Sequence, residues 1–263
     1  MPNRNKPLKP ESRSGGQTIE RAALLMRLIG RNSASGLRLS ELQLASGLTH
    51  GTVHRILKAL GRAGWVKQQP SDRRYRLGQF NWELGIATEF SWEFRDAIRP
   101  RMARLSEISG ETIHLVMRTG AEYVCLDFVR GANRLRNKMA DVGDRRPLCF
   151  GSVGWALMSL LPDGEIDEII EANHRDLAGH RRITEKVVRR EISRSRASGY
   201  AIAHDSTIVG LSALGIALRS SPSRPPLAIS VGMASERFTK SRVAELLDFV
   251  RGTFDGELFF KSR

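Results

Sequence analysis

The sequence predicts an α+β protein with two domains. A small N-terminal domain of helices ends in a β-hairpin, and a larger domain holds an antiparallel sheet with flanking helices. A length of 263 residues allows two separate cores. Residues 1–80 carry 15 Lys/Arg against 4 Asp/Glu, whereas residues 81–263 carry 27 against 24, so the first domain holds most of the positive charge. Beyond residue 110 the predicted strands and helices lack regular βαβ alternation, which favours an antiparallel sheet.

The N-terminal segment and the cysteines indicate the compartment. Residues 1–16 are basic, rich in Pro, Ser and Gly, and lack the apolar centre of a secretory signal, so we expect a disordered basic arm and a cytoplasmic protein. No apolar stretch reaches the ~18 residues of a membrane helix, so we expect no membrane partner. Cys125 and Cys149 lack the paired spacing of a zinc site or disulfide scaffold. We expect two reduced, half-buried thiols.

The first two predicted helices are joined by a short turn. Apolar residues recur at helical spacing between residues 18 and 30, at Ile19, Ala22, Ala23, Met26 and Ile29. A second helix is predicted from Ser40, as N-cap of a capping box with Gln43, to about Ser46. Gly47 suits the left-handed residue that ends a helix, and Thr49 suits the N-cap of the next. This order predicts a helix-turn-helix.

The helix after Thr49 has two different faces. Its apolar residues lie at positions i, i+3, i+4 and i+7, namely Val53, Ile56, Leu57 and Leu60, so this face packs on the first two helices. In such motifs the start of the second helix enters the major groove. A merely solvated polar face is the alternative. The outer face carries hydrogen-bonding or cationic side chains suited to bases and phosphates, at His50, Thr52, Arg55 and Lys58.

A β-hairpin follows directly and predicts a wing. Residues 65–69 and 73–77 alternate apolar and polar side chains around the turn Pro70-Ser71-Asp72. Its return strand presents arginines suited to phosphates or a narrow minor groove. We therefore expect residues 17–78 to form a winged helix-turn-helix that binds double-stranded DNA rather than a lipid surface. The predicted DNA-binding residues are Arg38, Thr49, His50, Thr52, Arg55, Lys58, Arg73, Arg74 and Arg76.

Residues 79–95 predict a linker helix, and residues 96–260 predict the second domain. The linker carries Trp82, Leu84, Phe90 and Trp92, which are candidate contacts between protomers. Pro100 is expected near the first turn of the next helix. Strands are predicted at residues 113–118, 123–129, 201–204, 214–218 and 227–233, and helices at residues 153–160, 164–172, 185–198 and 240–253.

No catalytic constellation is present in the sequence. It lacks a Gly-rich phosphate loop, a Gly-x-Ser-x-Gly elbow and a His-Glu-x-x-His pair, so we expect neither an enzyme nor a cofactor. His50 and His54 have a metal-binding spacing but no obvious third ligand, so no metal site is expected. Two alternatives stay open: an enzyme on a small metabolite with an accessory nucleic-acid-binding domain, and a nonspecific nucleoid or RNA-binding protein. The large, nearly neutral second domain disfavours the latter.

The order of these features resembles the isocitrate lyase regulator (IclR) family of bacterial transcription factors. The resemblance covers residues 18–254. The sequence differs from the common family pattern at His50-Gly51-Thr52, where Lys-Ser-Thr is usual, and at Trp155, where Lys is usual. The residues that carry the resemblance are Gly47-Leu48-Thr49, residues 52–57, Leu60, Gly64, residues 75–78, Pro147-Leu148, Gly154, residues 156–158, Gly199-Tyr200 and Gly210.

This resemblance implies a sequence-specific regulator of a catabolic operon, a repressor or dual regulator. It implies a GAF-like C-terminal domain that binds a small organic acid or aromatic metabolite as effector. Because one helix-turn-helix buries too little surface for tight DNA binding, we also expect a homodimer or dimer of dimers. Lys138 or the nearby Arg136 would pair with a carboxylate. Plain core or turn positions are the alternative for each carried-over residue. The effector-binding residues implied are Leu135, Lys138, Ser152, Val153, Ala203, Leu211, Ala213, Ser230 and Gly232.

Overall fold

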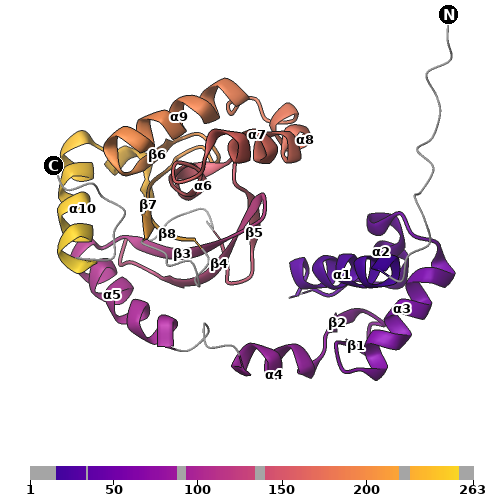
Figure 1. Cartoon of the computed structure of the whole chain (residues 1–263). Coiled ribbons are helices and arrows are strands. Elements are labelled where there is room, and N and C mark those ends of the chain that lie inside the picture. Colours follow the sequence, from indigo (N-terminus) through magenta and orange to yellow (C-terminus); the bar gives the residue numbers. More distant parts are fainter. Residues whose placement is uncertain (1–15, 34, 88–92, 134–139, 219–225, 255–263) are drawn as a thin grey trace, which may run out of the picture. The chain divides into compact units, whose positions relative to one another are not determined.

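The computed structural model of the chain describes residues 16–33, 35–87, 93–133, 140–218 and 226–254. It divides into two compact units, Met1–Thr88 and Glu89–Arg263, each with its own core (Figure 1). The arm expected over residues 1–16 lies outside the described residues except for Gly16, which begins the first helix. None of the helices in the described ranges combines the length and the apolar composition of a membrane span.

The first unit contains three helices around a small apolar core. They are α1 (Gly16–Arg31), α2 (Leu39–Ser46) and α3 (His50–Arg62). The core confirms the inward positions expected on α3, and on α1 it includes the expected Ile29 with Ala22 and Met26 packed against it. Two differences from the expected face are Leu25, which is buried, and Ile19, which is 72% exposed.

The ends of α2 and α3 follow from local hydrogen bonds. The N-cap of α2 is Arg38, not Ser40 as expected, because the Glu41 carboxylate reaches back and accepts the Arg38 backbone N–H at 2.7 Å. Gly47 has φ 66° and ends α2 in the left-handed conformation, as expected. The Thr49 hydroxyl accepts the Thr52 N–H and caps α3. The predicted helix-turn-helix is therefore confirmed.

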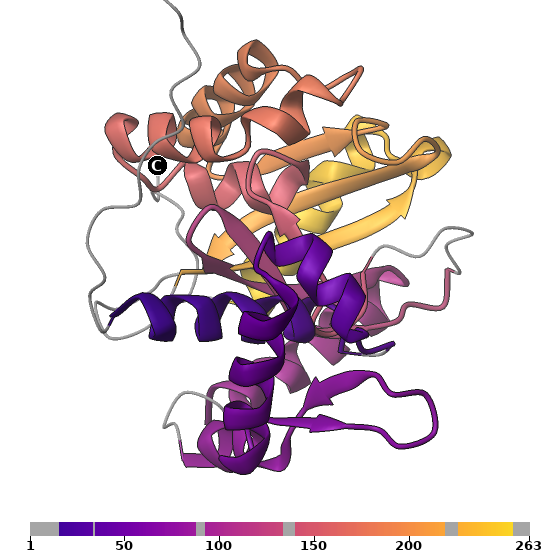
Figure 2. The same ribbon diagram turned by 90° about the vertical axis from the view of Figure 1, so that its right-hand side faces the viewer.

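The predicted wing is also present. Strands β1 (Val66–Gln68) and β2 (Tyr75–Leu77) pair antiparallel, and their hairpin extends away from the helices (Figure 2). Helix α4 (Gln79–Ala87) follows, with Trp65 and Phe80 packed edge to face. Of the four proposed linker contacts, Trp82 and Leu84 are exposed on α4, whereas Phe90 and Trp92 lie outside the described residues.

The second unit is built on the antiparallel sheet that the sequence predicts. Its strand order is β5-β4-β3-β8-β7-β6, and every neighbouring pair is antiparallel. Strand β5 was not predicted. The strands are β3 (Thr112–Thr119), β4 (Glu122–Val129), β5 (Arg145–Pro147), β6 (Ala201–His204), β7 (Leu211–Leu218) and β8 (Leu227–Ala234).

Helices cover both faces of this sheet (Figure 1). Residues of α5 and α10 share one apolar cluster with the sheet, and residues of α6 to α9 share another. Pro100 lies well inside α5 rather than near its first turn, because the helix begins at Glu93. The elements are α5 (Glu93–Ser109), α6 (Gly151–Met158), α7 (Asp163–Ala172), α8 (His174–Ala178), α9 (Glu185–Ser198), the 3-10 helix η1 (Ser235–Arg237) and α10 (Lys240–Thr253).

The two faces of the sheet carry side chains of different size. On β7 the large residues Leu214, Ile216 and Leu218 join the cluster of α5 and α10. The intervening Ala213, Gly215 and Ala217 are small, and successive residues of a strand point to opposite faces. A Cβ at Gly215 would lie 2.4 Å from the carbonyl carbon of Ser152, so the start of α6 sits directly on this face.

Candidate functional site

The outer face of α3 is a continuous polar surface. Arg55 and Lys58, both predicted to contact DNA, are exposed and lie opposite the buried residues of the helix. His54 is also exposed on this face, and the structure adds Arg62, which was not predicted although its spacing of four residues from Lys58 places it there. The His50 and His54 rings stack with centroids 6.4 Å apart. The helix thus presents two imidazoles and three cationic side chains.

The two threonines at the start of α3, Thr49 and Thr52, form hydrogen bonds within the helix. The hydroxyls of Thr49 and Thr52 are 2.9 Å apart, and Thr49 also caps the helix. Gly51 lies between them with open space where a Cβ would be. At Gly51 the first turn of α3 therefore presents backbone without a side chain, which allows another molecule to approach closely at this residue.

The wing arginines divide into two groups. Arg74 pairs with Glu41 at 3.0 Å and donates to the Gly36 carbonyl at 2.9 Å. Arg76 pairs with Asp72 at 2.8 Å, and its hydrogen bond to Asp72 lowers the pKa of that carboxyl to about 2. Both arginines thus tie the wing to itself or to the helices. Two predicted DNA-binding arginines remain exposed, Arg38 before α2 and Arg73 at the hairpin turn.

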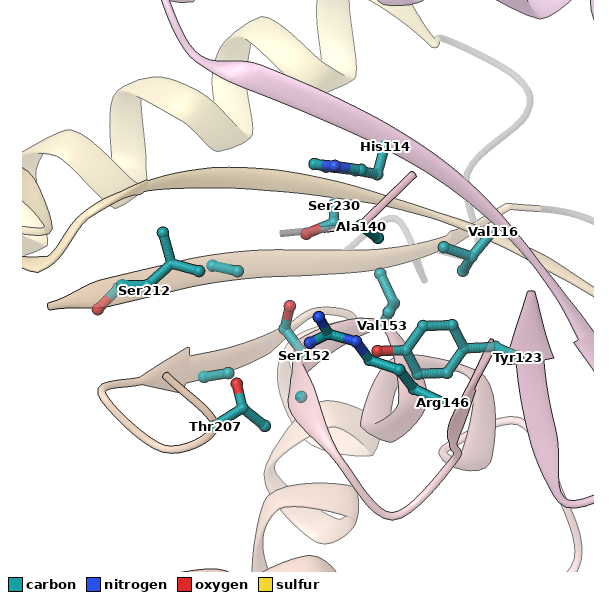
Figure 3. Close-up of a pocket in the computed structure, with 14 residues that line it drawn as sticks. His114, Val116, Tyr123, Ala140, Arg146, Ser152, Val153, Thr207, Ser212 and Ser230 are labelled. Atoms are coloured by element: carbon teal, nitrogen blue, oxygen red, sulfur yellow. The ribbon is translucent and has the colours of Figure 1, made fainter. Parts of the chain in front are cut away.

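A cavity of about 50 Å³ lies between the sheet and α6 in the second unit (Figure 3). Gly232 does not line it and pairs with Thr112 and Ala213 within the sheet. Leu135 and Lys138, with Arg136, lie outside the described residues. Six residues implied by the resemblance come together around the cavity, namely Ser152, Val153, Ala203, Leu211, Ala213 and Ser230.

Several polar lining residues were missed by the sequence interpretation. His114 comes from β3, Tyr123 from β4 and Arg146 from β5, and Tyr123 is the register partner of Arg146. Burial lowers the pKa of His114 to about 4 and raises the pKa of Tyr123 to about 12, so both are neutral near pH 7. Thr207 and Ser212 add hydroxyls. A cavity with hydroxyl groups, a neutral imidazole and a guanidinium can hold a compact polar molecule.

The described residues hold no cluster of three or more His, Cys, Asp or Glu side chains able to bind a metal. Cys125 and Cys149 are free and fully buried, rather than half-buried as expected, because one lies on a central strand and the other just before α6. Burial raises the pKa of each thiol to about 12. Neither thiol is therefore a reactive thiolate at neutral pH.

The fold defines a DNA-binding protein with a winged helix-turn-helix and a second α/β domain that encloses a cavity. Two family models match the chain: the IclR helix-turn-helix domain over residues 18–70, and the bacterial transcriptional regulator IclR C-terminal domain over residues 90–255. The chain belongs to the IclR family of bacterial transcriptional regulators. This family consists of regulators and not enzymes, so the enzymatic alternative is set aside.

Curated relatives and solved structures agree with this assignment. The chain is 26% identical to the HTH-type transcriptional repressor AllR of Klebsiella pneumoniae, over 93% of this chain and 90% of AllR. It is 24% identical to the regulator XynR of Escherichia coli K12, over 87% and 90% of the two chains. An IclR transcriptional regulator from a Silicibacter species has the same fold, with a TM-score of 0.80, 22% identity and coverage of 90% and 93%. An IclR homolog from Microbacterium hydrocarbonoxydans, complexed with 4-hydroxybenzoate, gives a TM-score of 0.69, 19% identity and coverage of 90% and 97%.

Proposed function

We propose that this regulator represses, or represses and activates, a catabolic operon under the control of a small organic acid or aromatic effector. The cavity between α6 and the sheet carries this proposal, because polar side chains line it beside an apolar cluster of the second unit. The relative AllR, a repressor, supports the proposed repression. The Microbacterium homolog, complexed with 4-hydroxybenzoate, supports control by a small aromatic acid. The cytoplasm, where DNA is accessible, is the proposed location.

In this proposal α3 reads the major groove. Arg55, Lys58 and His50 contact bases and phosphates from the exposed face of the helix. Arg73 and Arg38 reach neighbouring phosphates or the minor groove. The intradomain partners of Arg74 and Arg76 support a different role for these residues, which is to fix the wing and make at most secondary contacts with DNA.

We also propose a homodimer or a dimer of dimers on a pseudo-palindromic operator. Trp82, Leu84 and Ile86 are exposed on the short helix α4, and exposed apolar groups of this size are characteristic of protein interfaces. A two-fold dimer places two reading helices about 34 Å apart, or a multiple of it. Residues 79–95 link the domain with the cavity to the DNA-binding domain, so the effector would change the distance between the two reading helices.

The test compares full-length wild type with Arg55→Ala on duplexes of the protein's own promoter and a scrambled control, by fluorescence anisotropy at physiological salt. Arg55→Ala should weaken promoter binding by about 1 to 3 kcal/mol. Arg175→Ala, an exposed arginine of the second unit, serves as the matched control and should bind like wild type. Equal affinity of the wild type for promoter and scrambled DNA would refute sequence-specific regulation, and unchanged binding by Arg55→Ala would refute the orientation of α3.

A further inference from the structure

The cavity has one polar corner where side chains from three elements converge. Figure 3 shows the guanidinium of Arg146 directed toward the Ser152 hydroxyl at the start of α6, with the Ser230 hydroxyl of β8 across the cavity. Ser152 is 2% exposed and Ser230 4% exposed. Within the described part of the chain, no hydrogen bond to another residue uses either hydroxyl. Buried hydroxyls are normally paired, so these two are poised for a molecule in the cavity.

The position of Arg146 follows from strand geometry. Neighbouring residues of β5 point to opposite sides, so Arg145 pairs with Glu122 at 3.5 Å whereas Arg146 lines the cavity. The Arg146 guanidinium lies beside the buried Tyr123 hydroxyl (Figure 3), whose oxygen can accept from it and support it from one side. Tyr123 thus orients the guanidinium without adding a negative charge, because burial keeps the phenol protonated.

The electrostatic balance of this corner favours an anion. Among the described lining residues Arg146 is the one that carries a charge, because His114 is neutral. The negative charge of Asp141 opposes the lowering of the His114 pKa, but Asp141 does not line the cavity. A guanidinium beside one hydroxyl and facing a second across the cavity matches a carboxylate, which accepts two hydrogen bonds from the arginine fork and has lone pairs left for the serines.

We propose that Arg146 determines the class of effector: a compact carboxylate whose oxygens bind the Arg146 guanidinium and the Ser152 and Ser230 hydroxyls. This assignment rests on the proposed effector function and makes it specific. It replaces Lys138 or Arg136 as the anion partner with a residue that the sequence pattern did not single out. The corresponding amides, which have the same shape but no charge, are poor ligands.

The test uses matched acid and amide pairs on the full-length protein: benzoate and benzamide, 4-hydroxybenzoate and 4-hydroxybenzamide, lactate and lactamide. Thermal shift and titration calorimetry should show binding of at least one acid and at least tenfold weaker binding of its amide. Arg146→Gln should weaken binding of that acid at least tenfold, as expected for the loss of a charged hydrogen-bonded pair. Arg145→Gln, its neighbour on the opposite side of β5, should bind like wild type.

Tyr123→Phe provides a second variant if Arg146→Gln does not fold, as judged by circular dichroism. It removes the hydroxyl that holds Arg146 and should weaken acid binding several-fold. Equal binding of an acid and its amide, or undiminished acid binding by the folded variants, would overturn the anion site but leave effector control intact. Failure of every acid and amide to bind would overturn the proposed carboxylate class of effector. The promoter selectivity of the unliganded protein is measured separately, so this failure is distinguished from failure of the regulatory function.

Discussion

Replacing Gly215 with alanine tests the close contact between β7 and α6. The added Cβ would lie 2.4 to 2.7 Å from the backbone carbonyl of Ser152 and the backbone nitrogen of Val153. Carbon atoms pack favourably at about 3.5 to 4.0 Å, so the start of α6 must move by about 1 Å. Every residue of α6 is buried, so the movement cannot be absorbed at the surface. Overpacking of this kind costs about 1 to 3 kcal/mol.

Differential scanning calorimetry of the full chain measures this cost. A loss of 1 kcal/mol lowers the Tm of a domain of this size by about 2 to 4 °C, so Gly215→Ala should lower the Tm of the second unit by about 2 to 12 °C. Gly164→Ala is the control, because Gly164 lies in α7 with open space around it and alanine favours helix. A Gly215→Ala protein that melts within 1 °C of wild type would show that α6 is not packed against this strand.

Two further predictions follow from buried titratable groups. Burial holds the pKa of His114 near 4 instead of 6.5. Between these pH values the imidazole therefore binds a proton in the unfolded chain but not in the folded chain. The free energy of unfolding is thus fully retained above pH 6.5 and falls as pH falls toward 4. Urea unfolding at pH 7, 6 and 5 should show this fall in the free energy of unfolding, and His114→Gln should make its dependence on pH less steep. An equally steep dependence in the variant would contradict the lowered pKa of His114. Cys125 and Cys149, with pKa values raised to about 12, should resist a disulfide reagent such as DTNB at pH 8 and react only after unfolding, so rapid labelling of the native protein would contradict their burial.

Most of the fold could be predicted because its long elements have clear periodicity. The limits of α9, α10 and β6 agree with the expected residue ranges. Strand β5 was missed because its three residues, Arg145–Pro147, include two arginines and a proline and lack an apolar alternation. The cap of α2 was misplaced because Ser40 is the stronger N-cap by residue type, whereas the carboxylate of Glu41 decided the start.

Residue spacing alone predicted the candidate site only where neighbours in the sequence form it, whereas six residues of the cavity were implied by the family resemblance. The exposed face of α3 follows from helical spacing. The polar corner of the cavity depends on strand order, because β3, β4 and β5 bring His114, Tyr123 and Arg146 together from separate segments. The internal partners of Arg74 also depend on tertiary contact with Glu41, although the Asp72–Arg76 pair had a sequence signal in its spacing of four residues.

The two unequal faces of the second unit's sheet separate stable packing from ligand recognition, two requirements that often conflict when a protein evolves to bind a new ligand. The face with Leu214, Ile216 and Leu218 packs against α5 and α10 in an apolar cluster of its own. The opposite face around the cavity carries small or hydroxylated residues such as Ala213 and Ser230. A single substitution there reshapes the binding site while the other core stays untouched. Such a sheet is a suitable starting scaffold for biosensors, since libraries confined to the cavity face leave the apolar packing against α5 and α10 unchanged.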